Sequence, residues 1–144
     1  MLATYGPRCG LEHEQALRLA AGFGSGMRRA ATRGAVTGAF MVLGLARCDG
    51  KASRSRAGRA AASDAVVAFA HAFEQRHGSL HCRDLLGCDV STPEGHRTAI
   101  ERGLFQTRSV ALVRDAAQPL EAVLTPDGRD PVARATNAGP SDAG

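Results

Sequence analysis

The chain has 144 residues and a formal net charge of +4, which is enough for one domain with a hydrophobic core and a short tail. With no tryptophan and a single tyrosine, the core has to be built from Ala, Leu, Val, Met and five Phe residues, a composition that favours helix over sheet. Lys51 is the only lysine among 18 basic residues. Such an arginine bias can serve phosphate binding but more often reflects coding bias, so we expect no nucleic-acid partner.

The first expected helix spans residues 12–23, with Leu17, Ala20 and Ala21 on one face. The first fifteen residues lack the basic and apolar regions of a secretory signal, so we expect a soluble, cytoplasmic protein. The sequence GFGSG at residues 22–26 should end the helix, because glycines stop helices and permit tight turns. A phosphate-binding interpretation of these glycines would require a preceding strand, which the sequence does not predict.

The most apolar stretch, RGAVTGAFMVLGL at residues 33–45, predicts a second helix over about 33–46. Its 13 residues fall short of the ~20 that span a bilayer, so no membrane insertion is expected. Gly34 and Gly38 are four residues apart and share one face, which allows another helix to approach closely. Continuous apolarity predicts that this helix is buried on most sides.

Three further helices are predicted after a polar, mobile connection over residues 47–59. The third helix spans about residues 60–77, and its buried stripe consists of Val66, Phe69, Ala70 and Phe73. The fourth begins with Thr92 as N-cap and Pro93 in the first turn, and it ends near Gly103.

The last helix is expected over residues 106–124, and its apolar side consists of Val110, Val113, Ala117 and Leu120. Pro119 inside it favours a kink or an earlier end. Residues 125–144 lack periodicity and are rich in Pro, Gly and Asp, which predicts a disordered tail. The sequence therefore predicts an all-α domain over residues 1–124, a small bundle of about five helices.

Four cysteines (Cys9, Cys48, Cys82 and Cys88) are the main candidates for chemistry, and no two of them form a C-x-x-C pair. Cys82 opens a short helical turn, CRDLLG, where backbone N–H groups and Arg83 should lower the thiol pKa. A buried, inert cysteine is the alternative for both Cys82 and Cys88. We expect no role for Cys9 or Cys48.

A metal site is a weaker interpretation of the same region. His77, His81 and Cys82 cluster after the third helix, but a site would need a further ligand from elsewhere, and His71 is expected on a helix surface. No metal or other cofactor is therefore assigned. The sequence also lacks a Ser-His-Asp order, a paired-carboxylate constellation and a metalloprotease motif, so we expect no hydrolase chemistry.

Four segments, in this order, resemble the C_GCAxxG_C_C family over about residues 10–120: EQALRLAAGFGSGM, RGAVTGAFMVLGL, HGSLHCRDLLGCDVSTPEGHRTAIERGLF and VRDAA. Members of this family are small helical proteins with four signature cysteines, to which redox or metal-linked chemistry is ascribed. The resemblance implies the same helical fold and a thiol-dependent redox function for this chain.

The signature is incomplete in this chain. Gly34, Ala35 and Gly38 match the central C-G-A-x-x-G motif, but Arg33 stands where the family has its second cysteine. The resemblance implies that the third signature cysteine corresponds to Cys82 and the fourth position to Ser109, and we expect the N-terminal helix that carries the first to be missing from this sequence.

The resemblance leads to a hypothesis for Arg33. A guanidinium group cannot ligate a metal, because it stays protonated and offers no lone pair. Arg33 would instead lie near Cys82 and stabilise its thiolate, or bind an anion where the cysteines of the family meet.

The functional prediction is a thiol-dependent redox protein whose residual chemistry uses Cys82, aided by Cys88, with a redox partner protein. The alternatives are a helical interaction module that kept the fold and lost the redox site, and a Cys/His metal-binding protein. Uncovered apolar surface and close-packing glycine faces also make a homodimer a candidate assembly.

Overall fold

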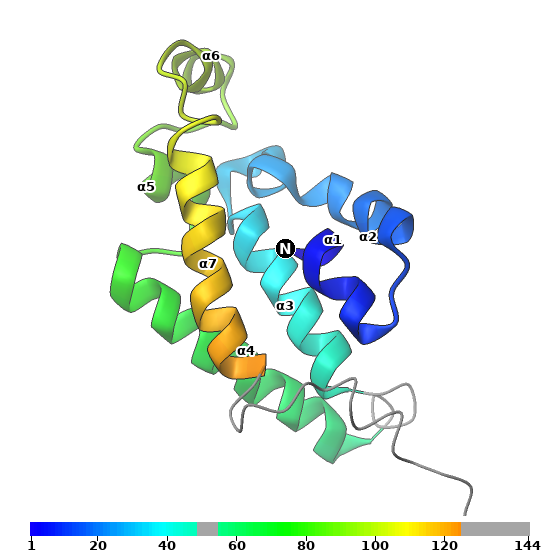
Figure 1. Ribbon diagram of the computed structural model, residues 1–144. Coiled ribbons are helices and arrows are strands. Elements are labelled where there is room, and N and C mark those ends of the chain that lie inside the picture. Colours follow the sequence, from blue (N-terminus) through cyan, green and yellow to red (C-terminus); the bar gives the residue numbers. More distant parts are fainter. Residues whose placement is uncertain (49–54, 125–144) are drawn as a thin grey trace, which may run out of the picture.

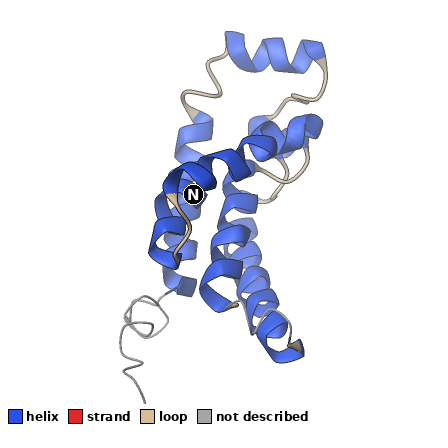
Figure 2. Cartoon of the chain, turned by 90° about the vertical axis from the view of Figure 1, so that its right-hand side faces the viewer, coloured by secondary structure: helices blue, strands red, loops and turns tan. Residues whose placement is uncertain are grey.

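The computed structural model describes residues 1–48 and 55–124, and every regular element in these ranges is helical (Figures 1 and 2). The α-helices are α1 Leu2–Tyr5, α2 His13–Ala20, α3 Gly34–Arg47, α4 Arg56–His77, α5 Cys82–Leu86, α6 Pro93–Glu101 and α7 Arg108–Leu124. Three short irregular helical segments are η1 Gly6–Cys9, η2 Ala21–Phe23 and η3 Gly26–Ala30. The all-α prediction is confirmed, although the described residues hold seven α-helices rather than five, because α1 and α5 are additional short elements.

Helix α3 is the central helix of the fold, as its apolar sequence predicts. It packs against α4 and α7 on one side and against α1 and η1 on the other (Figure 1). Val36, Ala39, Val42 and Leu43 have no exposed surface. Among the described residues, no helix is both long and apolar enough to cross a bilayer.

Gly34 and Gly38 of α3 permit close contact with the N-terminal part of the chain. A Cβ atom built on Gly34 would lie 2.8 Å from the carbonyl oxygen of Phe23, and one built on Gly38 would lie 3.0 Å from the Cβ atom of Met1. Both distances are shorter than ordinary packing allows. The predicted close approach is therefore confirmed, and the approaching segments are α1 and the end of η2.

Helices α4 and α7 complete the larger hydrophobic core. Phe69 and Phe73 of α4 are buried, as predicted, and Phe69 meets Phe40 of α3 edge to face with ring centroids 5.9 Å apart. Ser55 caps α4, which begins earlier than expected, and accepts a hydrogen bond from the Gly58 N–H group at 3.0 Å. Thr92 caps α6 in the predicted manner, by accepting a hydrogen bond from the Gly95 N–H group.

The predicted apolar faces of two helices are only partly correct. In α7 Leu120 is buried as predicted, together with Leu112 and Ala116, whereas Val110 and Val113 are about half exposed. The α7 sequence carries two apolar stripes, and packing against α3 and α4 selects the one at spacing i, i+4, i+8. Helix α7 also continues through Pro119 to Leu124.

In α2 the predicted face is shifted by one residue. Ala16 is fully buried, and Leu17 is 52% exposed. The α-helix ends at Ala20, and the remaining predicted residues form η2, so the glycine-rich sequence does end this helix as predicted. Residues 49–54 of the expected polar connection and the expected tail over residues 125–144 lie outside the described residues.

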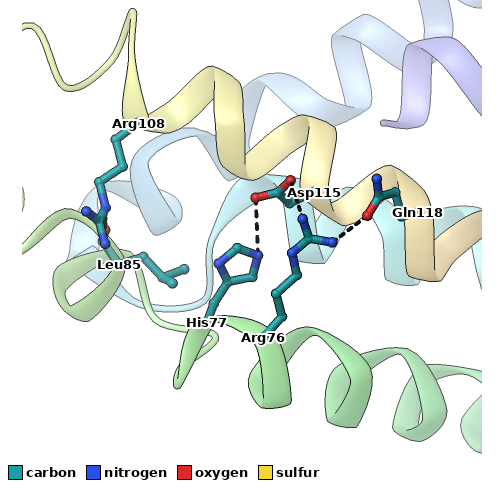
Figure 3. A network of polar contacts seen from close by, with 6 residues as sticks. All are labelled: Arg76, His77, Leu85, Arg108, Asp115 and Gln118. Carbon is teal, nitrogen blue, oxygen red and sulfur yellow. Dashed lines mark hydrogen bonds and ion pairs between the residues drawn. The ribbon is translucent and has the colours of Figure 1, made fainter.

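A polar network joins the end of α4 to α7 (Figure 3). Asp115 of α7 faces two α4 side chains, Arg76 with Nη2 at 3.2 Å and His77 with Nε2 at 3.6 Å. Arg76 also donates a hydrogen bond to Gln118, and Arg108 donates one to the carbonyl oxygen of Leu85. These contacts fix the end of α4 and the start of α7 around the segment that leads into α5.

A second, smaller core lies at the end of the molecule that carries α5 and α6. It contains six buried residues, with Cys88 and Phe105 packed against them: Ala30, Cys82, Leu86, Val90, Ala99 and Leu104. Cys82, the main candidate for chemistry in the sequence, is therefore part of this smaller core, next to the N-terminal end of α3.

Candidate functional site

Two backbone segments that are far apart in the sequence pair beside the smaller core. The N–H group of Arg33 donates to the carbonyl oxygen of Leu80 at 2.9 Å, and the N–H group of Cys82 donates to the carbonyl oxygen of Ala31 at 2.8 Å. An isolated antiparallel bridge between Thr32 and His81 lies between these two bonds. The pairing therefore places the residue before α3 beside the first residue of α5.

The side chains of Arg33 and Cys82 meet in the interior. The Arg33 Nη1 group donates a hydrogen bond to the Cys82 Sγ atom at 3.4 Å. Arg33 is 7% exposed and Cys82 is 0% exposed. The hypothesis that Arg33 lies next to Cys82 is confirmed.

Burial controls the acidity of the Cys82 thiol more strongly than Arg33 does. Loss of solvent around Cys82 raises the pKa of its thiol, and the nearby Cys88 raises it further. The charge and hydrogen bond of Arg33 lower the pKa, but the net direction is upward. The predicted lowering at the start of α5 is therefore wrong, because the thiol is enclosed in an apolar core and α5 has only five residues.

An unusual loop leads into Arg33. Between the end of η2 and Ala31, four residues other than glycine have positive φ angles of 51–57°: Ser25, Met27, Arg28 and Ala30. This conformation costs about 1–2 kcal/mol for each L-residue, so it persists only where the surrounding packing fixes it. Ala30 supplies that packing, because it is fully buried in the smaller core beside Cys82.

A cavity of about 180 Å³ lies at the N-terminal end of α3. It is lined by Gly24, Ser25, Arg33, Gly34, Ala35, Phe105 and Ser109. The Nε atom of Arg33 and the Oγ atom of Ser109 are buried and have no hydrogen-bond partner among the described residues. None of the lining residues is acidic, so the cavity has an uncompensated positive character.

The other cysteines occupy separate places. All four lie in the described ranges, and none is in a disulfide. Cys88 is partly buried against the smaller core, just after the left-handed Gly87 that ends α5. Cys9 ends η1 and Cys48 follows α3, so both lie on elements other than the two segments whose pairing joins Arg33 to Cys82.

The histidines do not gather around Cys82. His77 stacks on Phe73 with ring centroids 4.4 Å apart, and it faces Asp115 (Figure 3). His71 and His81 are exposed. Within the described part of the chain, no group of three or more His, Cys, Asp or Glu side chains is arranged to hold a metal ion.

Sequence reasoning missed the contribution of Gly24 and Ser25 to this site. The sequence GFGSG predicts the end of a helix, and it also supplies one wall of the cavity. The serine among these glycines, just before Arg28 and Arg29, is the one sequence feature that could have indicated a site here. The left-handed backbone that turns this segment toward α3 is formed mainly by residues other than glycine.

The three positions that the resemblance singled out meet at this site. Arg33 and Cys82 are in contact, and Arg33 and Ser109 line the same cavity. Gly34 and Ala35 of the central motif form the remaining part of the same wall. The family name writes the central motif as GCAxxG, with the cysteine directly before the alanine, so the matching position in this chain is Gly34. Arg33 stands where the motif has its glycine, and the expectation that Arg33 replaces the second cysteine is therefore wrong.

The chain matches one known family over most of its length. The family model described as "Putative redox-active protein (C_GCAxxG_C_C)" matches residues 1–123. Neither the curated proteins nor the solved structures include a match to this chain. The match covers most of the sequence, including every described residue that forms the site, and the chain therefore belongs to the C_GCAxxG_C_C family.

Proposed function

We propose that this protein is a thiol-dependent redox protein in which Cys82 is the reacting thiol, Arg33 stabilises its thiolate and Cys88 is the second thiol. The observation that carries the proposal is the hydrogen bond from Arg33 Nη1 to Cys82 Sγ inside the protein. The family to which the chain belongs supports redox chemistry in general.

The charge of Arg33 supports a thiolate at Cys82. A buried guanidinium group is costly unless an anion or several acceptors compensate it. No carboxylate pairs with Arg33 in the described ranges, and its side-chain hydrogen bond goes to the Cys82 sulfur atom. Deprotonation of Cys82 would provide the missing negative charge, so the pair is stabilised when the thiol ionises.

The proposed reaction is thiol–disulfide exchange with a redox partner protein. The Cys82 thiolate attacks one sulfur atom of a partner disulfide, the partner S–S bond breaks, and the released partner thiolate takes up a proton. The Cys88 thiolate then attacks Cys82 Sγ, which releases the second partner thiol and leaves a Cys82–Cys88 disulfide. The partner disulfide gains two electrons, and the two cysteines of this protein lose two.

Burial of Cys82 implies that the site must open before it reacts. Cys82 has no exposed surface, and the backbone bonds between residues 31–33 and 80–82 cover it. Breaking these few bonds would separate α5 from the loop before α3 without disturbing the larger core. We therefore expect reactivity to depend on local opening and the thiol to be protected otherwise.

The test is disulfide mapping by mass spectrometry after incubation of the reduced protein with a small disulfide. We expect a Cys82–Cys88 disulfide in the unmodified protein and a trapped mixed disulfide on Cys82 in the Cys88→Ser variant. Cys48→Ser is the matched control and should leave the Cys82–Cys88 product unchanged. Modification of Cys9 and Cys48 alone, with Cys82 and Cys88 still reduced, would contradict the proposal.

A second candidate function, a helical interaction module, is favoured by an apolar groove of about 510 Å³ along the C-terminal half of α3. It is lined by Leu2, Leu11, Leu19, Phe23, Met41, Gly44, Leu45 and Cys48. Leu19 is 57% exposed and Leu45 is 38% exposed, so the rim offers apolar side chains to a partner.

The occupant proposed for the groove is a second copy of this chain. Sedimentation of the reduced protein should then show a dimer that Leu19→Lys converts to a monomer, while Val67→Lys, on the exposed face of α4, leaves the dimer intact. A monomer at all concentrations would contradict the interaction module and leave the redox proposal unaffected.

A further inference from the structure

We infer that the cavity between Arg33, Ser109 and the N-terminal end of α3 is a binding site for a small tetrahedral oxyanion of the phosphate or sulfate type. This inference does not depend on any reaction at Cys82. It rests on the donors that line the cavity, on their lack of partners and on the absence of acidic residues from the lining.

The first donor is the Arg33 side chain. Arg33 is only 7% exposed, so more than nine-tenths of the residue is buried. Its Nη1 group donates a hydrogen bond to Cys82 Sγ. Its Nε–H group is buried and has no partner among the described residues, although the residue lines the cavity. Guanidinium groups bind oxyanions through two N–H groups of one plane, so the unpaired Nε–H marks a place for an acceptor.

The second donor is the hydroxyl group of Ser109, in the first turn of α7. Its Oγ atom is also buried without a partner among the described residues, and Ser109 lines the same cavity. A buried hydroxyl without a partner costs free energy. An oxyanion in the cavity would accept hydrogen bonds from both Ser109 and Arg33, so each of these buried groups would gain a partner.

The third donor group is the beginning of α3, a helix of 14 residues. The N–H groups of Val36 and Thr37 donate to the carbonyl oxygen of Arg33. The N–H groups of Gly34 and Ala35 have no partner in the described ranges, and both residues line the cavity. Helix N-termini favour anions through such free N–H groups and through the helix dipole.

The size of the cavity and the arrangement of its donors select the ligand class. A volume of about 180 Å³ is several times the ~30 Å³ of one water molecule and suits a small ion rather than a nucleotide. The guanidinium group and the helix terminus at the start of α3 and the hydroxyl group on α7 all line the cavity, which suits an acceptor with oxygens in several directions. A tetrahedral oxyanion has this form, whereas a carboxylate is planar.

An oxyanion in the cavity and a thiolate at Cys82 would compete for the charge of Arg33. Because binding free energies are reciprocal, a bound oxyanion makes ionisation of Cys82 less favourable, and an ionised Cys82 weakens the oxyanion. The site would therefore also set how readily the thiol ionises when the anion concentration changes.

The test is calorimetric titration of the reduced, full-length protein with inorganic phosphate in a zwitterionic buffer of low ionic strength. We expect saturable binding with one site, similar binding of sulfate, weaker binding of acetate and no saturable heat with chloride. Ser109→Ala should weaken phosphate binding several-fold, and Arg33→Met should weaken it at least tenfold. Arg97→Met, which removes an exposed arginine, is the matched control and should bind like the unmodified protein.

Three results would overturn the inference: phosphate heat that does not saturate, a Ser109→Ala variant that binds as tightly as the unmodified protein, or an equal loss in Arg97→Met. Acetate that binds as tightly as phosphate would replace the proposed class with carboxylates. If Arg33→Met fails to fold, as circular dichroism would show, the Ser109→Ala variant decides the question. Retained phosphate binding in Cys82→Ser, which has no Cys82 thiol, separates this site from the proposed redox function.

Discussion

At the scale of single residues, Arg33 determines the character of the site. It is a buried cation at the end of an apolar helix, and its contacts are a thiol sulfur on one side and a cavity with unpartnered donors on the other. The sequence offers this interpretation only through the resemblance, because nothing local marks Arg33 as buried. Arg33 and Cys82 are 49 positions apart, so their contact comes from the fold.

The first prediction concerns the unpartnered hydroxyl of Ser109. Without an oxyanion, Ser109→Ala removes a buried group that has no partner and should stabilise the protein by about 1 kcal/mol. Urea unfolding in phosphate-free buffer measures this change, and added phosphate should reduce it. Ser55→Ala is the opposite control, because it removes an N-cap bond and should cost about 1 kcal/mol. A Ser109→Ala variant that is less stable without phosphate would contradict the prediction.

The second prediction concerns Tyr5, whose hydroxyl donates to Glu121 Oε1 at 2.6 Å. Burial and the bond to Glu121 raise the pKa of Tyr5 from 10.0 to about 12. The folded state therefore keeps a proton that the unfolded state loses first, so this stability is present below pH 10 and is lost as the pH rises toward about 12.

Tyr5→Phe should remove this pH dependence and cost about 1 kcal/mol at neutral pH, where the hydrogen bond is intact. The measurement is urea unfolding at several pH values between 8 and about 11. The raised pKa of Cys82 adds a pH dependence of the same sign to the unmodified protein and to Tyr5→Phe. The difference between their two stability profiles therefore reports on Tyr5 alone. Parallel pH profiles for the two proteins would contradict the assignment.

At the scale of elements, two features build the site: the close packing at the start of α3 and the left-handed loop before it. Neither is a property of a regular helix. Gly34 lies where the backbone of Phe23 leaves no room for a side chain, and the loop holds Ala30 against Cys82.

The third prediction compares two glycines of α3. Gly34→Ala should destabilise the protein by about 1–3 kcal/mol, because its Cβ atom would lie 2.8 Å from the Phe23 carbonyl oxygen. Gly44→Ala meets nothing within 4 Å and should stabilise it by about 0.5–1 kcal/mol, since alanine favours helix. Thermal unfolding of both variants measures this contrast. Stability changes of the same sign in both would contradict the close contact between Gly34 and the Phe23 carbonyl group.

The fourth prediction tests the left-handed loop with two neighbouring exposed arginines. Arg28 has φ of 57°, whereas Arg29 is not among the residues with positive φ. Arg28→Gly should stabilise the protein by about 0.5–1 kcal/mol through relief of the left-handed conformation, and Arg29→Gly should destabilise it by a similar amount through added chain entropy. Chemical unfolding distinguishes them, and equal destabilisation by both would contradict the left-handed path.

At the scale of the whole molecule, the sequence predicts the helices that have strong periodicity or clear caps. The apolar run of α3, the Phe69 and Phe73 stripe of α4 and the Thr92 cap of α6 all appear as expected. Helix α1 is missed because four residues cannot show a period. The prediction of the buried face of α7 is only partly correct, because the sequence of α7 carries two apolar stripes. The tertiary contacts that choose between these stripes are not local in the sequence.

The site is predictable only in part for a similar reason. The resemblance points to Arg33, Cys82 and Ser109, and the fold brings these positions together. It does not indicate that burial raises the pKa of the Cys82 thiol, because burial depends on Ala30, Leu86 and Val90 from three separate segments. The cavity wall from Gly24 and Ser25 depends on a loop whose left-handed residues have no sequence signature.

The most direct test of the account is the pKa of the Cys82 thiol with and without Arg33. In a background with the other three cysteines replaced by serine, the absorbance of the thiolate can be titrated for Cys82 alone. We predict that Arg33→Met raises the pKa of Cys82, because it removes the charge and the hydrogen bond that lower this pKa, while Arg97→Met leaves it unchanged. An unchanged or lower pKa in Arg33→Met would contradict the claim that Arg33 stabilises the thiolate.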